Sequence, residues 1–163
     1  MKITKSVAAS LNAHLYLHAG SHLGAVVHGQ IIPWDDDVDA IMDFRKMKKF
    51  VAICERKGVV VHPSGVRLRC KKHKKCYKIW LHYEGMVKMT NKRVPWYPPF
   101  IDLFFYNIKD GRFWEVMPNG RRKESTQNYA LSEYFPTRPY YFGGKIVPVS
   151  DIHFYQWIQI LLE

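Results

Sequence analysis

Four carboxylates lie within five positions of this chain, in the run Asp35-Asp36-Asp37-Val38-Asp39. Like charges this close repel one another, so they are tolerated only where water solvates them or a cation neutralises them. The residues that follow, Ala40-Ile41-Met42, are apolar and predict a short buried strand. Because side chains two positions apart point to the same face of a strand, Asp37 and Asp39 are expected to project together.

Paired carboxylates are hard oxygen ligands, of the kind that Mg²⁺ and Mn²⁺ take together with substrate phosphates. Upstream, Gly20-Ser21 follows the apolar run Leu15-Tyr16-Leu17, which predicts a strand that turns into a helix. A glycine lets a phosphate approach the backbone, and a serine hydroxyl and the amides of a helix start can bind it. The sequence therefore predicts a phosphate cradle and a metal pair at one end of a sheet, which is the layout of phosphoryl or nucleotidyl transfer.

A third candidate carboxylate is Asp102, which interrupts the strongly apolar run from Pro98 to Tyr106. A lone carboxylate inside such a strand is costly without a charged or hydrogen-bonding partner. One interpretation is an inward Asp held by a local amide or a salt bridge. The other, which we favour, is the third carboxylate of the metal site, on a strand beside the first two. Asp35 and Asp36 are expected to be structural or to lie outside direct metal contact.

The remaining pattern predicts an α/β fold, a small mixed sheet flanked by helices. Asp43 is a plausible N-cap for an amphipathic helix, and Cys54 falls on the apolar face of that helix. The Asp110-Gly111 pair indicates a hairpin turn. Further strands are predicted at residues 59–61, 66–70 and 79–83, and helices at 6–12 and 151–163.

Residues 71–76, between two of these strands, are predicted to form a basic hairpin loop with four lysines. The spacing Cys70-x2-His73-x2-Cys76 resembles a zinc site, but it is tighter than the usual paired ligand sets and no clear fourth ligand follows. The lysines also disfavour a dication. We therefore interpret the segment as a solvated loop that steers anions.

The formal net charge of +11, from 25 Lys and Arg against 14 Asp and Glu, indicates an anionic partner: a nucleotide, a polyphosphate donor, nucleic acid or an acidic glycan. No nucleic-acid-binding motif is recognisable, which disfavours that class. No apolar run approaches the roughly 20 residues that span a bilayer, and no signal peptide is predicted. The length of 163 residues fits one domain, and three cysteines do not make a disulfide framework.

The segment G-S-H-L-G-A-V-V-H-G-Q-I-I-P-W-D-D-D-V-D, residues 20–39, resembles the LicD/fukutin family. The motif of that family runs roughly G-[ST]-L-L-G-A-x-R-H-G-x-I-P-W-D-x-D-[IV]-D. Residues 134–149 also resemble a family stretch of the form F-P…F-G-x-x-V-x-P. The arginine that the family has before His-Gly is Val27 here, and His18-Ala19 replaces an acidic residue. The resemblance implies a nucleotidyltransferase fold of the DNA polymerase beta type.

The resemblance also implies an activity: metal-dependent transfer of a phospho-alcohol group from a CDP-activated donor to a glycan hydroxyl. The group would be phosphocholine, ribitol phosphate or glycerol phosphate. The implied catalytic and metal-binding residues are Asp37, Asp39 and Asp102, with Mg²⁺ or Mn²⁺. The implied substrate contacts are Gly20, Ser21 and His28, and some of Arg67, Arg69, Lys71 and Lys72 are expected to hold nucleotide or glycan.

Two alternatives remain open from the sequence. The first is a nucleotidyltransferase that moves NMP from an NTP to a small molecule. The second is an inactive, truncated homologue that binds anionic glycan through its basic surface. Family members normally continue into a further block after the helix at 151–163, so residues 1–163 are expected to be a single domain, incomplete at the C-terminus. The implied compartment is the cytoplasm for a bacterial-like member and the Golgi lumen for an animal-like one.

Overall fold

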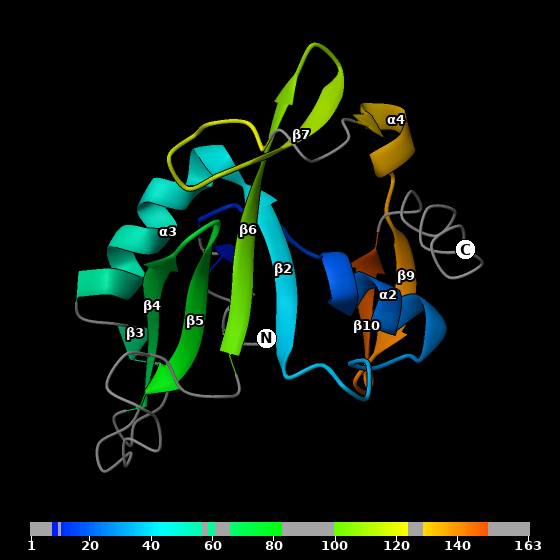
Figure 1. The fold of residues 1–163 in the computed structure, drawn as a ribbon, viewed down its shortest axis with the longest axis horizontal. Helices are drawn as coiled ribbons and strands as arrows, with labels where there is room; N and C mark the ends of the chain where they lie inside the picture. Colours follow the sequence, from blue (N-terminus) through cyan, green and yellow to red (C-terminus); the bar gives the residue numbers. More distant parts are fainter. Residues whose placement is uncertain are drawn as a thin grey trace.

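The computed structural model describes residues 8–9, 11–56, 59–60, 66–82, 100–123 and 129–149. These residues form an eight-stranded mixed sheet in the order β1-β2-β6-β5-β4-β3, with β7 paired to β6 and β8 to β7, and a separate hairpin of β9 and β10 (Figure 1). The strands are β1 (Leu15–Leu17), β2 (Asp37–Asp43), β3 (Val59–Val60), β4 (Arg67–His73), β5 (Cys76–His82), β6 (Phe100–Lys109), β7 (Arg112–Val116), β8 (Tyr129–Ala130), β9 (Arg138–Phe142) and β10 (Lys145–Val149). The helices are α2 (Ala19–Val27), α3 (Phe44–Arg56) and α4 (Leu131–Tyr134).

The centre of the sheet is the parallel pair β2–β6, in which Asp39 lies opposite Asp102. The other described strand pairs are antiparallel. The predicted mixed sheet flanked by helices is therefore confirmed, and so is the expectation that Asp102 lies on a strand beside the strand of Asp37.

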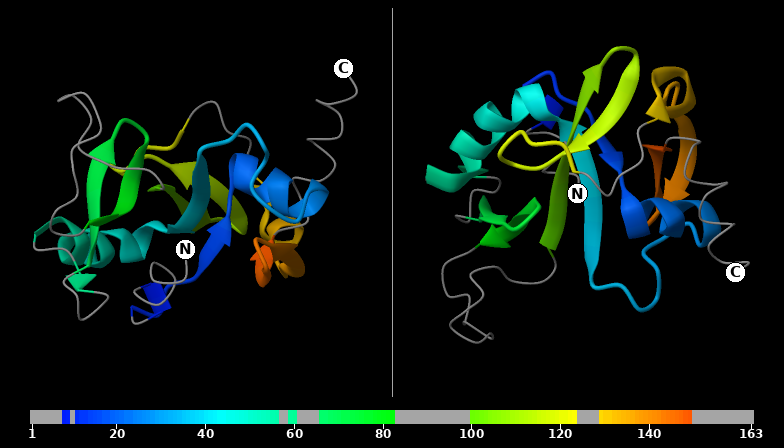
Figure 2. Two further views of the ribbon diagram at one scale, coloured as in Figure 1. Left: turned by 90° about the horizontal axis from the view of Figure 1, so that it is seen from below. Right: turned by 45° about the horizontal axis from the view of Figure 1, so that its top comes forward.

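Helix α3 covers one face of this sheet (Figures 1 and 2). It begins after Asp43, whose Oδ1 accepts a hydrogen bond from the backbone N–H of Arg45 at 2.8 Å, as an N-cap does. The predicted N-cap and the core position of Cys54 are confirmed, since Cys54 is fully buried. The apolar side of α3 packs in one core cluster with Ala40, Met42, Leu68, Cys70, Ile79, Leu103 and Phe105 of the sheet. The alternate residues of the same strands therefore project from the opposite face.

The sequence predicts two of the hairpin turns, one of them with the correct extent. Asp110 and Gly111 have φ values of 52° and 67°, as a type I′ turn requires, and the predicted turn is confirmed. The prediction of a loop over residues 71–76 is too long. Strands β4 and β5 remain paired over most of this segment, and only Lys74-Lys75 form the turn. Lys74 takes a φ of 45° there, which is uncommon for a residue with a Cβ.

Helix α2 packs against the β9–β10 hairpin rather than against α3 (Figure 1). Its residue Ala25 is buried in a second core cluster with Leu17, Phe142 and Val147. The hairpin was not predicted from the sequence, although its turn, Gly143-Gly144 with φ values of 54° and 81°, is a recognisable hairpin signal.

Two predictions lie outside the described residues: the helix at 151–163 and most of the helix at 6–12. Val61 and residue 83, the predicted ends of two strands, also fall outside them. In the described parts of the chain, no helix is long and apolar enough to cross a membrane.

Gly24 provides a test of the packing between α2 and the segment that leads to the acidic run. A Cβ at this position would overlap the carbonyl oxygen of Gln30 and lie 3.3 Å from the backbone nitrogen of Ile32. Because backbone atoms cannot rotate away, we expect Gly24→Ala to lower the free energy of unfolding by about 1–3 kcal/mol. Urea denaturation followed by circular dichroism measures this. Val27→Ala, an exposed position on the same helix, is the control and should change stability little.

Candidate active site

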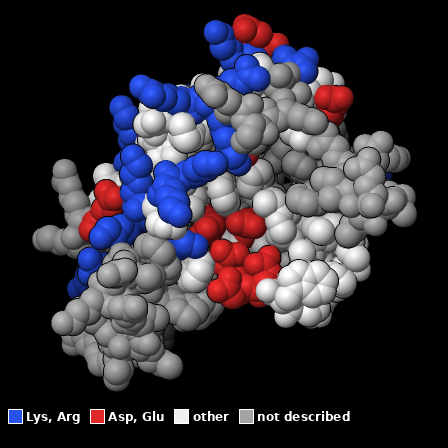
Figure 3. Space-filling view, in the orientation of Figure 1, with Lys and Arg blue, Asp and Glu red and all other residues white. Residues whose placement is uncertain are grey.

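Three carboxylates converge at the start of β2. Asp35, Asp37 and Asp39 each offer one oxygen, and these oxygens all lie within 4.8 Å of one another. Asp37 and Asp39 come from the strand, and Asp35 comes from the preceding loop, where its N–H donates to the carbonyl of Ile32 at 2.9 Å. Figure 3 shows acidic side chains gathered on the face that α3 leaves uncovered, with Lys and Arg side chains along one side of them. We call these three residues the acidic cluster.

The start of α2 positions the acidic cluster. The Ser21 hydroxyl accepts a hydrogen bond from the backbone N–H of Asp39 at 2.9 Å, and the N–H of His18 donates to the Asp39 carbonyl at 3.1 Å. Gly20 donates its backbone N–H to the Asp39 carboxylate. A Cβ on Gly20 would lie 2.8 Å from Oδ2 of Asp35, so a larger residue here would require the Asp35 carboxylate to move. The polar groups of Gly20 and Ser21 thus hold the cluster, and phosphate binding by them stays a prediction.

The half-buried acids Asp37 and Asp39 resist ionisation. Burial, followed by the charges of the neighbouring carboxylates, raises the pKa of Asp39 to about 7. The same two causes raise the pKa of Asp37 to about 6, although Lys78 opposes them. Such shifts are the mark of charges that need a cation nearby, and they are common at functional sites. Three converging hard oxygens fit Mg²⁺ or Mn²⁺.

Asp102 lies beside Asp39 but has a different partner. Its Oδ1 accepts a hydrogen bond from Nζ of Lys78 at 2.6 Å, and the same Nζ lies 3.7 Å from Oδ2 of Asp37. Lys78 is buried, and its ammonium also lies 3.8 Å from the ring centre of Phe100. Lys78 therefore neutralises charge between the strands β2 and β6.

The sequence analysis missed Lys78. Its signal was a lone lysine in the apolar run of β5, which is the counterpart of the lone aspartate in β6. The position of Asp35 also differs from expectation, because the structure places its carboxylate within the acidic cluster. Asp102 forms the salt bridge that the sequence analysis considered as the alternative to metal binding. Asp36 is exposed and stands outside the cluster, as expected.

A second buried charge cluster lies beside the start of α2. Glu115 of β7 is buried, and its carboxylate contacts Nζ of Lys123 at 2.7 Å and Nε2 of His18 at 3.5 Å. Burial alone would raise the pKa of Glu115, but the hydrogen bonds and charges of His18 and Lys123 lower it below its usual value. His18 is one of the two residues that replace the acidic residue of the family motif. Its contact with Glu115 links the start of α2 to β7.

The remaining predicted site residues are more dispersed. His28 is exposed at the C-terminal end of α2, with its ring centre 6.5 Å from that of Trp34. Its substrate contact stays a prediction. Cys70, His73 and Cys76, the possible zinc ligands, do not converge on a common point. Among the described residues, the group whose geometry could hold a metal ion is the acidic cluster. A hydrogen bond with Cys54, together with burial, raises the pKa of Cys70, and Cys76 donates to the carbonyl of His73 at 3.5 Å.

The four basic candidates of β4 separate onto two faces. Leu68 and Cys70 belong to the core under α3, so Arg67, Arg69 and Lys71 project from the face that carries the acidic cluster. The register of adjacent strands gives the row Lys71–Lys78–Asp102–Asp39 across that face. Lys72 lies on the opposite face. We call Arg67, Arg69 and Lys71 the basic ridge.

Comparison of the chain with known protein families gives one match. The family model of the LicD/FKTN/FKRP nucleotidyltransferase domain matches residues 12–150, which include the acidic cluster, Asp102 and both sheets. The chain belongs to this family. Membership of the LicD family indicates a transferase with a phosphotransferase-type role in glycan modification. No curated protein matches the chain.

The raised pKa of Asp39 predicts a pH dependence of stability without divalent metal. The folded-state value of about 7 exceeds the ordinary value of 3.8, so the folded chain binds more protons between these two values. Stability in EDTA should therefore fall as the pH rises from about 4 to about 7. At pH 7.5, Asp39→Asn should raise the free energy of unfolding by about 2 kcal/mol and flatten the pH profile.

Urea unfolding across this pH range checks this prediction, with Asp36→Asn as the control. The control removes one exposed charge next to the cluster and should leave most of the slope in place. Equal flattening of the pH profile by both variants would contradict a specific role for the half-buried Asp39.

Lys78 and Asp102 form a pair whose contribution a double-mutant cycle can isolate. Lys78→Met leaves the half-buried Asp102 without its cation, so we expect a loss of about 3 kcal/mol in the free energy of unfolding. Adding Asp102→Asn should restore part of this loss, because the carboxylate nearest to Lys78 is then neutral and only the longer contact with Asp37 is missing. Lys71→Met, an exposed neighbour in the same row, is the control and should cost little. Additive losses in the double variant would show that the pair does not act as a unit.

Proposed function

We propose that this chain transfers a phospho-alcohol group, phosphocholine or ribitol or glycerol phosphate, from a CDP-activated donor to a hydroxyl of a glycan. The observation that supports the proposal is the convergence of Asp35, Asp37 and Asp39 beside the start of α2, where Gly20 donates a hydrogen bond to Asp39. The family supports the reaction class, and the acidic cluster supports a metal-dependent mechanism.

The acidic cluster is proposed to hold Mg²⁺ or Mn²⁺ through Asp35, Asp37 and Asp39. Bound there, a divalent ion would neutralise the charge that develops on the departing CMP. Gly20 and Ser21 keep Asp39 in place through the contacts described above, so the ligand oxygens are preorganised. A preorganised cluster loses little free energy to reorganisation when the charge of the reaction changes.

Asp102 is proposed either to complete the metal site or to accept the proton of the acceptor hydroxyl. Its ion pair with Lys78 fixes the position of its carboxylate beside Asp39. The basic ridge lies two strands further along the same face, where it is suited to the diphosphate of the donor or to an anionic glycan. A charged guanidinium from Arg69 or Arg67 would serve either role through paired hydrogen bonds.

The test is a calorimetric titration of CDP-choline, CDP-ribitol, CDP-glycerol, CTP and ATP into the protein, each with Mg²⁺, with Mn²⁺ and with EDTA. We expect saturable, metal-dependent binding of one CDP-alcohol and its loss in Asp37→Asn/Asp39→Asn, because the ligands of the ion are then gone. Asp36→Asn is the matched control, since it removes an exposed carboxylate of the same run and should leave the affinity within about twofold.

The other outcomes separate the alternatives. Preference for an NTP over every CDP-alcohol would instead indicate a nucleotidyltransferase. Glycan binding that survives Asp37→Asn/Asp39→Asn and weakens steeply with salt, without nucleotide binding in any condition, would indicate an inactive homologue that binds through its basic surface.

A further inference from the structure

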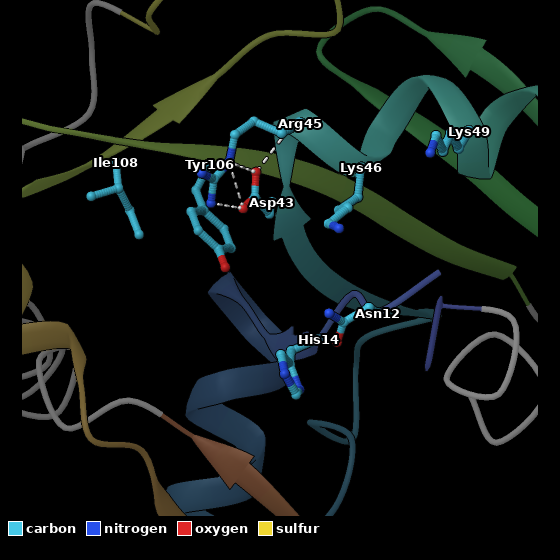
Figure 4. A pocket seen from close by; sticks show the side chains of 8 residues that line it. All are labelled: Asn12, His14, Asp43, Arg45, Lys46, Lys49, Tyr106 and Ile108. Carbon is cyan, nitrogen blue, oxygen red and sulfur yellow. Dashed lines mark hydrogen bonds and ion pairs between the residues drawn. The ribbon is translucent and has the colours of Figure 1, made fainter. Parts of the chain in front are cut away.

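A pocket of about 550 Å³ lies at the end of β2 opposite to the acidic cluster. It opens between the segment before β1, the first turns of α3 and the far half of β6 (Figure 4). Six residue steps separate Asp37 from Asp43, which at about 3.3 Å per residue is roughly 20 Å along the strand. The pocket is therefore separate from the proposed active site. Its lining residues are Asn12, His14, Asp43, Arg45, Lys46, Lys49, Tyr106 and Ile108.

The charge of this lining is positive after its internal ion pair is accounted for. Asp43 accepts hydrogen bonds from Nε of Arg45 at 3.0 and 3.1 Å, so these two charges neutralise each other. Burial would raise the pKa of Asp43, but the Arg45 contacts and Lys46 lower it, which keeps the carboxylate ionised. Lys46 and Lys49, three positions apart on α3, then leave a net charge of two positive units at the pocket.

The hydroxyl of a mostly buried tyrosine points into the same space. Tyr106 is only 6% exposed, and Figure 4 shows its hydroxyl directed toward the side of the pocket where His14 lies. The hydroxyl faces the pocket, so it can donate a hydrogen bond to an acceptor atom of a ligand bound there. Burial raises the pKa of Tyr106, so the hydroxyl stays a donor.

We propose that this pocket binds the phosphate monoester of a small sugar or polyol. A phosphate monoester carries between about 1.5 and 2 negative charges at pH 7, which matches the net charge of the described pocket lining. The pocket volume falls within the range of about 300–1,000 Å³ that is typical of small-molecule sites, so it holds more than a phosphate ion alone. Ile108 is the one apolar aliphatic residue of the lining, and the other walls offer hydrogen bonds, which suits a hydroxyl-rich body.

The binding site is tested by calorimetry on the full chain in EDTA at constant ionic strength, with glycerol 3-phosphate, inorganic phosphate and glycerol as probes. We expect saturable binding of one glycerol 3-phosphate, weaker binding of inorganic phosphate and no binding of glycerol. Lys46→Gln/Lys49→Gln should raise the Kd for glycerol 3-phosphate about tenfold or more, because both cations are lost. Tyr106→Phe keeps the ring and should raise it about fivefold, because only the hydroxyl donor is lost.

Two controls make the result specific. Lys48→Gln removes an exposed lysine of the same helix that does not line the pocket, and it should leave the Kd unchanged. Asp37→Asn/Asp39→Asn should leave it unchanged as well, so the outcome does not depend on the proposed function.

Three results would overturn the proposal. The first is the absence of saturable binding by glycerol 3-phosphate. The second is an equal effect of Lys48→Gln and the pocket variants, which would mean that diffuse surface charge attracts the probe. The third is an unchanged Kd in Tyr106→Phe, or loss of binding only in the Asp37→Asn/Asp39→Asn variant, which would place the probe elsewhere.

Discussion

The parallel register of β2 and β6 is the constraint on which the rest of the structure depends. It sets Asp39 beside Asp102 on one face and, on the other, Ala40 beside Leu103 in the core under α3. A slip of one residue would turn the carboxylates into that core and the apolar side chains toward solvent. The hydrophobic pattern that stabilises the sheet therefore also fixes where the carboxylates lie.

This placement has an electrostatic cost that several neighbours offset. Lys78 supplies a buried cation between the strands, and the start of α2 supplies hydrogen bonds to the backbone and carboxylate of Asp39. These contacts do not remove the repulsion, because the pKa values of Asp37 and Asp39 remain raised. The repulsion among these carboxylates therefore lowers the stability of the folded chain at the site where the family resemblance implies catalysis. Such a trade-off between function and stability is common.

Local patterns predicted much of this arrangement. The apolar run predicted β2, the two-residue period of a strand paired its carboxylates, helical spacing predicted α3, and the Asp-Gly pair predicted the β6–β7 turn. The contribution of Lys78 was not predictable in the same way, because its contact with Asp102 depends on the register of two strands that are distant in sequence. The position of the Asp35 carboxylate depends on the conformation of a loop, and a loop has no residue periodicity from which that position could be predicted. The length of β4 was underestimated, because cross-strand pairing outweighs the low strand propensity of consecutive lysines.

The distribution of charge along the central strands bears on how an anionic donor would approach the proposed site. A chain with a net charge of +11 attracts polyanions from all sides, yet three carboxylates at the proposed reaction centre would repel a diphosphate at short range. The basic ridge stands three strand spacings from Asp39, roughly 14 Å, so it can hold one part of an extended donor while another part reaches the acidic cluster. Productive approach therefore requires that the cluster be neutralised first. In the proposed reaction, attraction of the donor and catalysis would therefore be separate tasks: the ridge would attract anions in general, and only the neutralised cluster would admit the diphosphate.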